Sequence, residues 1–280
     1  MRADCHMHMV LDGVEWRAAI ARHKEAPQED FIRDVLGRYR ELGYTYLRDG
    51  GDRWGVGAKA RELAAAYGIT YRTPLAPLCK AGHYGSFIGT VYGDFKEYAR
   101  LVVLARQAGA DFIKIMISGL MDFDRFGVLT QEGLPKEDIR ELVHIAHEEG
   151  MSVMAHANGG DTVRAAAEAG VDSVEHGAYL HEEALWAMKQ AGTVWVPTLS
   201  TVGNLRGKGR FSETDVEKIL ESALQNVAAF HAMDGLLAAG TDAGAWAVPH
   251  GSTTEEGYFA MVGVDEDALS RGFDVIRKKF

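Results

Sequence analysis

The chain alternates short β-rich runs with amphipathic helical runs along its whole length, and this alternation constrains its fold more than any other feature. Eight runs predict strands: Asp4–Val10, Tyr44–Arg48, Ile69–Leu75, Asp111–Ile117, Met151–Ala155, Ser173–Glu175, Thr193–Thr198 and Leu236–Ala239. Apolar residues at helical spacing predict helices: Pro27–Leu42, Val56–Tyr67, Phe95–Ala108, Lys136–Glu149, Asp161–Ala169, Glu182–Ala191, Glu213–Met233, Thr254–Met261 and Asp265–Lys279. Strands that alternate with helices predict right-handed crossovers and a parallel sheet.

Eight such units in 280 residues predict an α/β protein with one domain, a (β/α)8 TIM barrel over residues 1–280. The alternative is an open doubly wound sheet, which would want a glycine-rich phosphate turn after its first strand. His6-Met7-His8 occupies that position instead, so we favour the barrel.

The least regular segments follow the third, fourth, seventh and eighth strands, and we expect them at the mouth of the barrel where such enzymes hold their chemistry. These segments are Lys80–Gly93, Gly119–Leu134, Thr201–Arg210 and Ala243–Thr254. Segment 119–134 is apolar, which suits either a lid over the site or a contact with another subunit.

Net charge and cysteine content limit the partners and the compartment. A net charge of −10 disfavours binding to DNA or RNA. Two cysteines are too few for a disulfide framework, and no apolar run is long enough to cross a membrane. We therefore expect a soluble, cytoplasmic protein with a small-molecule substrate. The sequence leaves the oligomeric state open, a homo-oligomer included.

Residue types that bind metals stand at the carboxyl ends of the predicted strands. His6 and His8 are two apart in the first strand, so their side chains point to the same face. The fourth, fifth, sixth and eighth strands contribute Lys114, His156, His176 and Asp242. Because the carboxyl ends of parallel strands meet at one mouth, we expect these six side chains to converge.

Each of these residues also has a purely structural alternative. His156 and His176 would suit hydrogen-bonded core histidines, and Asp242 before Ala-Gly would suit the start of a turn. Lys114 interrupts an apolar run, where an unpaired charge is costly. Six coincidences at the correct strand ends are less plausible than one metal centre.

From Ala3 to about Gly251 the chain resembles the amidohydrolase superfamily. The resemblance is carried by His6-Met7-His8, Phe112-Ile113-Lys114-Ile115-Met116, His156-Ala157, Glu175-His176-Gly177 and Gly240-Thr241-Asp242-Ala243-Gly244. Tyr46-Leu47-Arg48-Asp49-Gly50-Gly51 is similar to the branch of imidazolonepropionase-related enzymes and lysine-bridged dipeptidases. Members of that branch usually add a small β-sandwich built partly from residues ahead of the His-x-His strand, so we expect a barrel without that sandwich here.

The resemblance implies two divalent metal ions. His6, His8 and Asp242 would hold the first ion, and His156 and His176 the second. Lys114 would bridge them as a carbamate formed with carbon dioxide. Mixed imidazole and carboxylate ligands suit zinc, with manganese, iron or cobalt as alternatives. A hydroxide between the two ions would attack the substrate, and Asp242 would be the catalytic proton shuttle.

The implied reaction is hydrolysis of an amide C–N bond in a dipeptide, an N-acyl amino acid or a cyclic amide, with a carboxylate on the substrate. Lactone or phosphoester hydrolysis could use the same ions. Lys114 argues against mononuclear deamination, and the filled ligand positions argue against a non-catalytic barrel. Candidate substrate contacts lie after the third, fifth and sixth strands: Lys80, His83, Tyr84, Asn158 and Tyr179.

Overall fold

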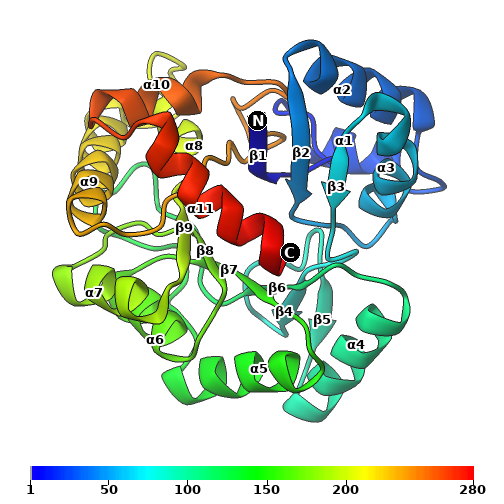
Figure 1. Ribbon diagram of the computed structural model, residues 1–280, viewed down its shortest axis with the longest axis horizontal. Helices are drawn as coiled ribbons and strands as arrows, with labels where there is room; N and C mark the ends of the chain where they lie inside the picture. The colour runs from blue at the N-terminus through cyan, green and yellow to red at the C-terminus, as the bar shows by residue number, and fades with distance from the viewer. Residues whose placement is uncertain (1) are drawn as a thin grey trace.

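A computed structural model describes residues 2–280 and has a parallel α/β architecture. Its strands are β1 Arg2–Met7, β2 Tyr44–Asp49, β3 Thr70–Arg72, β4 Leu78–Lys80, β5 Thr90–Tyr92, β6 Ile113–Met116, β7 Val153–Ala157, β8 Ser173–His176 and β9 Val194–Val196. Its helices are α1 Trp16–Arg22, α2 Glu29–Glu41, α3 Val56–Ala64, η1 Ala65–Tyr67, α4 Phe95–Gln107, α5 Lys136–Glu148, α6 Gly160–Glu168, α7 Glu182–Ala191, α8 Ser200–Gly203, α9 Glu213–Ala232, α10 Thr254–Met261 and α11 Glu266–Lys279. Figure 1 shows the strands near the centre and most of the helices around them.

The strands form two parallel sheets, ordered β1-β2-β3 and β5-β4-β6-β7-β8-β9. Segment 236–243 lies between β9 and β1: the Trp195 amide donates to Leu236 O over 2.8 Å, and the Cys5 amide donates to Ala239 O over 2.9 Å. Beyond β3, the Asp111 amide donates to Thr73 O over 3.0 Å, next to the start of β6. These bonds join the two sheets on both sides.

Alternation along the strands separates an outer core from an inner one. In β6, Ile113 and Ile115 belong to the outer core under the surrounding helices, and Lys114 points to the opposite face. Side chains of the last helical segment, Phe273 and Phe280 among them, pack into the inner core. That core also contains Cys5, Tyr46, Phe112, Met154, Val194, Val196, Ala238 and Ile276.

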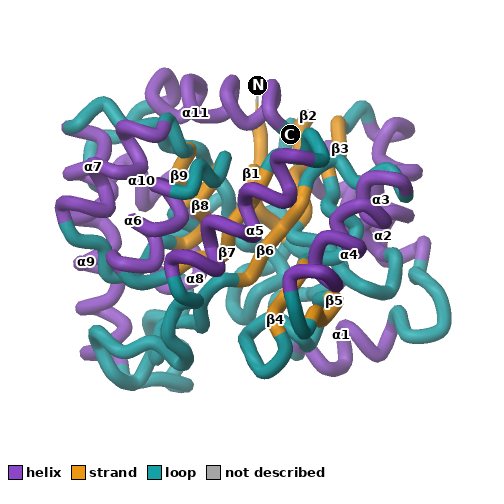
Figure 2. Tube along the Cα trace, turned by 90° about the horizontal axis from the view of Figure 1, so that it is seen from below, coloured by secondary structure: helices purple, strands orange, loops and turns teal. Residues whose placement is uncertain are grey.

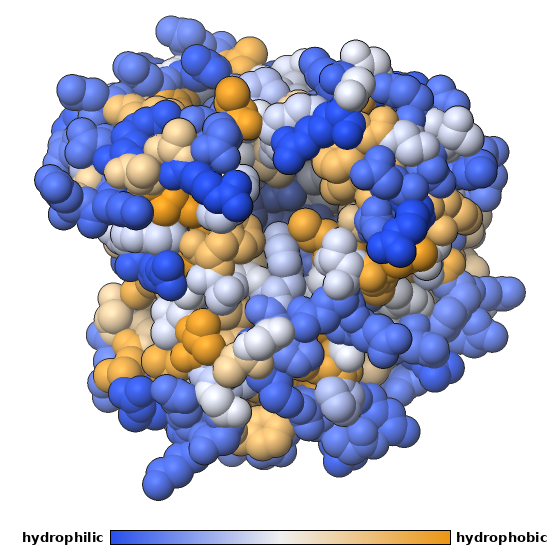
Figure 3. All heavy atoms as spheres, turned by 180° about the vertical axis from the view of Figure 1, so that it is seen from behind, coloured by the Kyte–Doolittle hydropathy of each residue, from blue (hydrophilic) through white to orange (hydrophobic). Residues whose placement is uncertain are grey.

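Helix α11 covers one end of the strands. It crosses in front of them in Figure 1 and lies above them in Figure 2. Seen from the opposite side, the surface is hollowed near its centre, with hydrophilic and hydrophobic residues mixed around the hollow (Figure 3). The carboxyl ends of the strands are therefore the accessible ends.

The predicted alternation of strands and helices is confirmed, with three differences. Segment 80–93 is not simply a loop, because β5 and the end of β4 lie within it. Each of these strands has three residues, too few to show an alternating pattern. In the predicted strand Leu236–Ala239 only Leu237 forms a bridge. Helices α1 and α8 were not predicted. None of the helices in the described part of the chain is long and apolar enough to cross a bilayer.

Candidate metal centre

Three of the six predicted ligands come together at the end of β1. Among the described residues, the ligand atoms of His6, His8 and Asp242 all lie within 4.8 Å of one another. The Nε2 atoms of His6 and His8 are 3.4 Å apart, and Asp242 Oδ1 lies 3.4 Å from the first and 3.2 Å from the second. All three residues are buried. Two imidazole nitrogens and a carboxylate oxygen thus face one point.

Backbone bonds between β1 and segment 236–243 hold Asp242 against the two histidines. The Asp242 amide donates to His6 O, and the His8 amide donates to Ala243 O, both over 2.7 Å. The buried carboxylate of Asp4 accepts from the Thr241 hydroxyl over 2.6 Å and from the Thr241 amide over 2.9 Å. Asp242 itself has a left-handed backbone with φ 56°. Such strain in a non-glycine residue is frequent at functional sites.

The second pair of histidines lies beside the first group. The ring centroids of His156 and His176 are 4.5 Å apart, and His176 lies 5.0 Å from His6. Strand alternation alone would send His176 outward with Val174, which packs in the outer core. A left-handed backbone at His176, with φ 68°, ends that alternation and lets its ring lie with the other imidazoles.

Lys114 is the predicted bridging residue, and its environment is unusual. The side chain is 1% exposed, and no hydrogen-bond partner for its Nζ exists within residues 2–280. Burial lowers the pKa of Lys114 to about 8. A larger fraction of the amine is therefore neutral near pH 7 than for an exposed lysine, and the neutral amine is the nucleophilic form.

In three of the four buried imidazoles, one ring nitrogen has a hydrogen-bond partner outside the histidine group and, among the described residues, the other does not. His6 Nδ1 lies 2.7 Å from Glu175 Oε2, and His176 Nδ1 lies 2.8 Å from Thr198 Oγ1. His156 Nε2 lies 3.2 Å from Gly119 O. Burial lowers the pKa of His156 to about 3 and holds the pKa values of His6 and His176 well below their usual value. These rings are neutral near pH 7, the form that binds metals.

Sequence reasoning assigned no role to two buried charged residues behind His6. Glu175 contacts His6 through one oxygen and Arg48 through the other, with Arg48 Nη2 2.8 Å from Oε1. Neither Arg48 nor Glu175 has exposed side-chain surface. Each of these residues is a charged residue inside a buried strand, which was the one sequence pattern that could have indicated a role. The ion pair between them joins β2 to β8, so no local sequence pattern predicts it.

Two of the predicted substrate contacts show no contact with the six ligands. Lys80 ends β4, and its Nζ lies 2.7 Å from Asp138 Oδ2. His83 follows in a turn, where its amide donates to Lys80 O over 2.9 Å. Its buried Nδ1 finds no partner in the part of the chain that is described.

The other three lie against the second pair of histidines. The Tyr84 ring is 4.9 Å from that of His156, and the Asn158 amide nitrogen donates to Gly119 O over 3.0 Å. Asn158 Oδ1 also accepts from the Ala178 amide, so this side chain holds two backbone segments. Tyr179 has a left-handed backbone with φ 57°.

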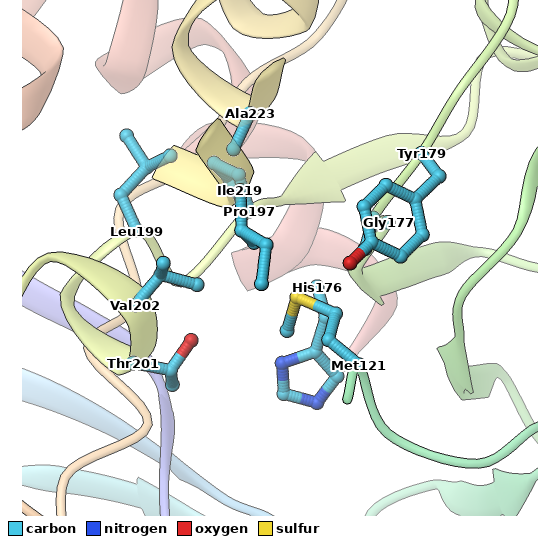
Figure 4. Close-up of a pocket in the computed structure, with 11 residues that line it drawn as sticks. Met121, His176, Gly177, Tyr179, Pro197, Leu199, Thr201, Val202, Ile219 and Ala223 are labelled. Atoms are coloured by element: carbon cyan, nitrogen blue, oxygen red, sulfur yellow. The ribbon is translucent and has the colours of Figure 1, made fainter. Parts of the chain in front are cut away.

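A small pocket of about 10 Å³, room for about one water molecule, opens beside His176. Figure 4 shows Leu199 and Val202 opposite Met121 and Tyr179, with the His176 ring at the edge. The remaining lining residues are Gly177, Ala178, Pro197, Thr201, Ile219 and Ala223. Within residues 2–280 the Tyr179 hydroxyl has no hydrogen-bond partner. The walls are mostly apolar.

Comparison with known proteins identifies the family. A profile of the amidohydrolase family matches residues 63–270. The chain belongs to the amidohydrolase family. The amidohydrolase is 26% identical to ochratoxinase of Aspergillus niger over an alignment of 300 positions, which covers 92% of this chain and 59% of the ochratoxinase. The chain thus spans about three fifths of the length of this curated relative.

Solved structures show the fold of this amidohydrolase. It is similar to a Xaa-Pro dipeptidase with bound methionine, with TM-score 0.75 and 22% identity over 99% of this chain and 75% of that one. It is also similar to a prolidase complexed with N-methylphosphonate-L-proline, with TM-score 0.77 and 22% identity over 99% and 73%. These amidohydrolase neighbours imply a TIM barrel.

The site of this amidohydrolase fits divalent metal ions. Imidazole nitrogens and a carboxylate oxygen are the donors that zinc and related ions prefer. Among the described residues, Lys114 Nζ and Asp242 Oδ1 are buried polar atoms without a hydrogen-bond partner. Because such atoms are costly to leave unpaired, their presence beside the histidines fits a bound cation.

Proposed function

We propose that this amidohydrolase is a metal-dependent hydrolase that cleaves an amide C–N bond in a small, carboxylate-bearing substrate. The substrate class comprises dipeptides, N-acyl amino acids and cyclic amides. The observation that carries the proposal is the convergence of His6, His8 and Asp242 beside a second histidine pair and a buried lysine without a hydrogen-bond partner among residues 2–280. Similarity to a Xaa-Pro dipeptidase supports the amide class.

His6, His8 and Asp242 would hold one divalent ion, and His156 and His176 a second. Lys114 would join the two sites as a carbamate: the neutral amine adds to carbon dioxide and loses a proton. Zinc suits these donors, and manganese, iron or cobalt would also fit. When bound, such ions polarise the scissile carbonyl and lower the pKa of water.

Asp242 would move the proton. Its Oδ1 faces both His6 and His8, so the carboxylate would lie beside an ion held there and within reach of the water that such an ion activates. The same carboxylate would then deliver that proton to the leaving nitrogen, which departs as a neutral amine. General acid–base catalysis of this kind contributes about 10²–10⁴-fold to a rate.

The predicted substrate contacts divide into two groups. Tyr84 and Tyr179 lie beside the histidine pair, and Asn158 holds the backbone around it. Burial raises the pKa of Tyr84, so its hydroxyl stays a neutral donor. Lys80 and His83 would bind the substrate carboxylate, and Lys80 would have to leave Asp138 to do so.

Domain organisation is also proposed. The hydrogen bonds on both sides of the two sheets support a single (β/α)8 barrel, with segment 236–243 as its last strand.

A matched substrate panel tests the function. The metal-loaded protein is given dipeptides, N-acyl amino acids, lactones and phosphoesters, and each amide also with its carboxylate amidated. We expect amide hydrolysis that a chelator abolishes and zinc restores, with much lower kcat/KM for the amidated substrates. Turnover of lactones or phosphoesters alone, or turnover unaffected by the chelator, would contradict the proposal.

A further inference from the structure

Glu175 lies directly behind His6. Its Oε2 is 2.7 Å from His6 Nδ1, and neither side chain is exposed. An ionised carboxylate only accepts hydrogen bonds, so Nδ1 carries the proton of the neutral ring and donates it. The lone pair of His6 is then on Nε2. That atom faces His8 and Asp242.

The second oxygen of Glu175 is bound by Arg48, a residue of β2. Arg48 Nη2 donates to Oε1 over 2.8 Å, while Arg48 Nε donates to Cys5 O over 2.7 Å. The Arg48 guanidinium also lies 4.5 Å from the centre of the Phe280 ring. Both oxygens of the buried Glu175 carboxylate are thus hydrogen-bonded, which restricts its orientation.

A buried ion pair is weak evidence for stability, because apolar residues of similar volume often serve as well. The geometry supplies another reason for its presence here. Ligand histidines are commonly oriented by a hydrogen bond from the other ring nitrogen to a carboxylate. Glu175 makes that bond to His6, and Arg48 fixes Glu175.

We propose that Glu175, held by Arg48, is a positioning residue that sets the tautomer and ring orientation of His6 for metal binding. This inference rests on the proposed function, because it assumes an ion at His6. Because Glu175 is fully buried behind His6, we assign it no role in proton transfer. Loss of such an outer partner typically costs about 10–100-fold in metal affinity.

Two variants separate positioning from a merely structural role. Glu175→Gln weakens the bond to His6 and leaves Arg48 without its counter-charge. The double variant Arg48→Met with Glu175→Leu removes both charges and leaves no unpaired one behind. Asp172→Asn is the matched control: Asp172 is also a buried carboxylate, bound to Lys279 and His147, and it touches none of the six ligands.

The experiment has two readouts on the full chain. Zinc affinity of the metal-free protein is measured by competition with a chelating dye, and the tautomer of His6 by 15N NMR of its ring in metal-free protein. We expect Nδ1 protonation in the wild type. Both Glu175 variants should bind zinc about 10–100-fold more weakly and shift His6 towards Nε2 protonation, while Asp172→Asn should keep wild-type affinity and tautomer.

Folded Glu175 variants with wild-type zinc affinity and an unchanged His6 tautomer would overturn the inference. If Glu175→Gln does not fold, the double variant Arg48→Met with Glu175→Leu provides the test. A wild-type chain that binds neither zinc, manganese nor cobalt would instead overturn the proposed function. The ring spectrum of His6 would then still decide whether Glu175 orients it.

Discussion

Gly50 and His8 approach so closely that a methyl group at Gly50 would stand 2.2 Å from His8 Cε1. The backbone of Gly50 is not left-handed, so the space taken by the imidazole is what requires glycine here. The His8 ring thus occupies the space that a side chain at position 50, in the loop after β2, would need.

Gly50→Ala should therefore displace His8 and weaken metal binding. Overpacking of this kind costs about 1–3 kcal/mol of stability. Zinc content after dialysis and thermal unfolding measure the two effects. Gly257→Ala is the control, because nothing lies within 4 Å of a methyl group there and the residue is in helix α10. It should keep full zinc content and gain up to about 1 kcal/mol. Normal zinc content in Gly50→Ala would contradict the account.

Lys114→Met should keep the fold and lose the metal centre. Methionine replaces a buried amine with an apolar side chain of similar length, so we expect the free energy of unfolding to stay or rise. Metal content and turnover should both fall severely. Loss of a residue that only hydrogen-bonds to a metal ligand typically costs about 10–100-fold, and we expect a larger loss here. Lys114→Ala should lose metal and turnover too, with a cavity as an added cost. Two full ions and unchanged turnover in Lys114→Met would remove the bridging role.

Asp242→Asn should separate proton transfer from metal binding. The amide keeps one oxygen towards His6 and His8 but cannot accept the proton, so much of the metal should stay bound. We expect kcat at saturating zinc to fall by about 10²–10⁴-fold. A near-normal kcat would rule out Asp242 as the shuttle.

Glu255 predicts a pH dependence of stability. This buried carboxylate accepts from the Leu199 and Ser200 amides, and burial raises its pKa to about 8. The folded protein therefore holds this proton more tightly than the unfolded chain, in which the pKa of Glu255 is close to the ordinary 4.5 of a glutamate. Its contribution to stability is full below about pH 4.5 and is lost as the pH rises towards about 8.

Glu255→Gln should lack that slope. The difference in unfolding free energy, variant minus wild type, should become more positive by up to about 1.4 kcal/mol per pH unit between about pH 5 and 8. Urea unfolding at several pH values measures it, with any lost hydrogen bond appearing as a constant offset. Parallel curves for the two proteins would contradict the prediction.

Met121→Ala should widen the pocket beside His176. Met121 is buried at the edge of segment 119–134, whose Phe126 packs on Tyr179 at 5.5 Å between ring centroids. We expect kcat/KM to rise for substrates with a larger apolar group relative to small ones, with an overall stability loss of about 2–5 kcal/mol. An unchanged ratio across a graded substrate series would exclude this pocket from substrate selection.

The sequence predicts the convergence of the six candidate ligands because parallel strands end at one edge whatever their distance along the chain. Lys114 stands out since a single charge interrupts an apolar strand. The inward direction of the His176 ring could not be predicted in this way. It depends on a left-handed backbone at His176, which the alternating pattern of a strand does not predict. The same holds for ion pairs between distant elements, such as Arg48 of β2 with Glu175 of β8 and Lys80 of β4 with Asp138 of α5.

Strands β4 and β5 were not predicted, also because they depend on contacts with distant parts of the chain. They have three residues each. β4 pairs with β5 and β6, and β5 pairs with β4, so these strands are stabilised by their neighbours more than by their own sequence. Short elements of this kind are settled by tertiary contacts.

Anomalous diffraction at the zinc edge, from crystals of the zinc-loaded chain, tests the central claim most directly. The account predicts two peaks, one bound by His6, His8 and Asp242 and one by His156 and His176, with density for a carboxylated Lys114 between them. An absence of zinc among these side chains, or a Lys114 that points away from both histidine groups, would contradict it.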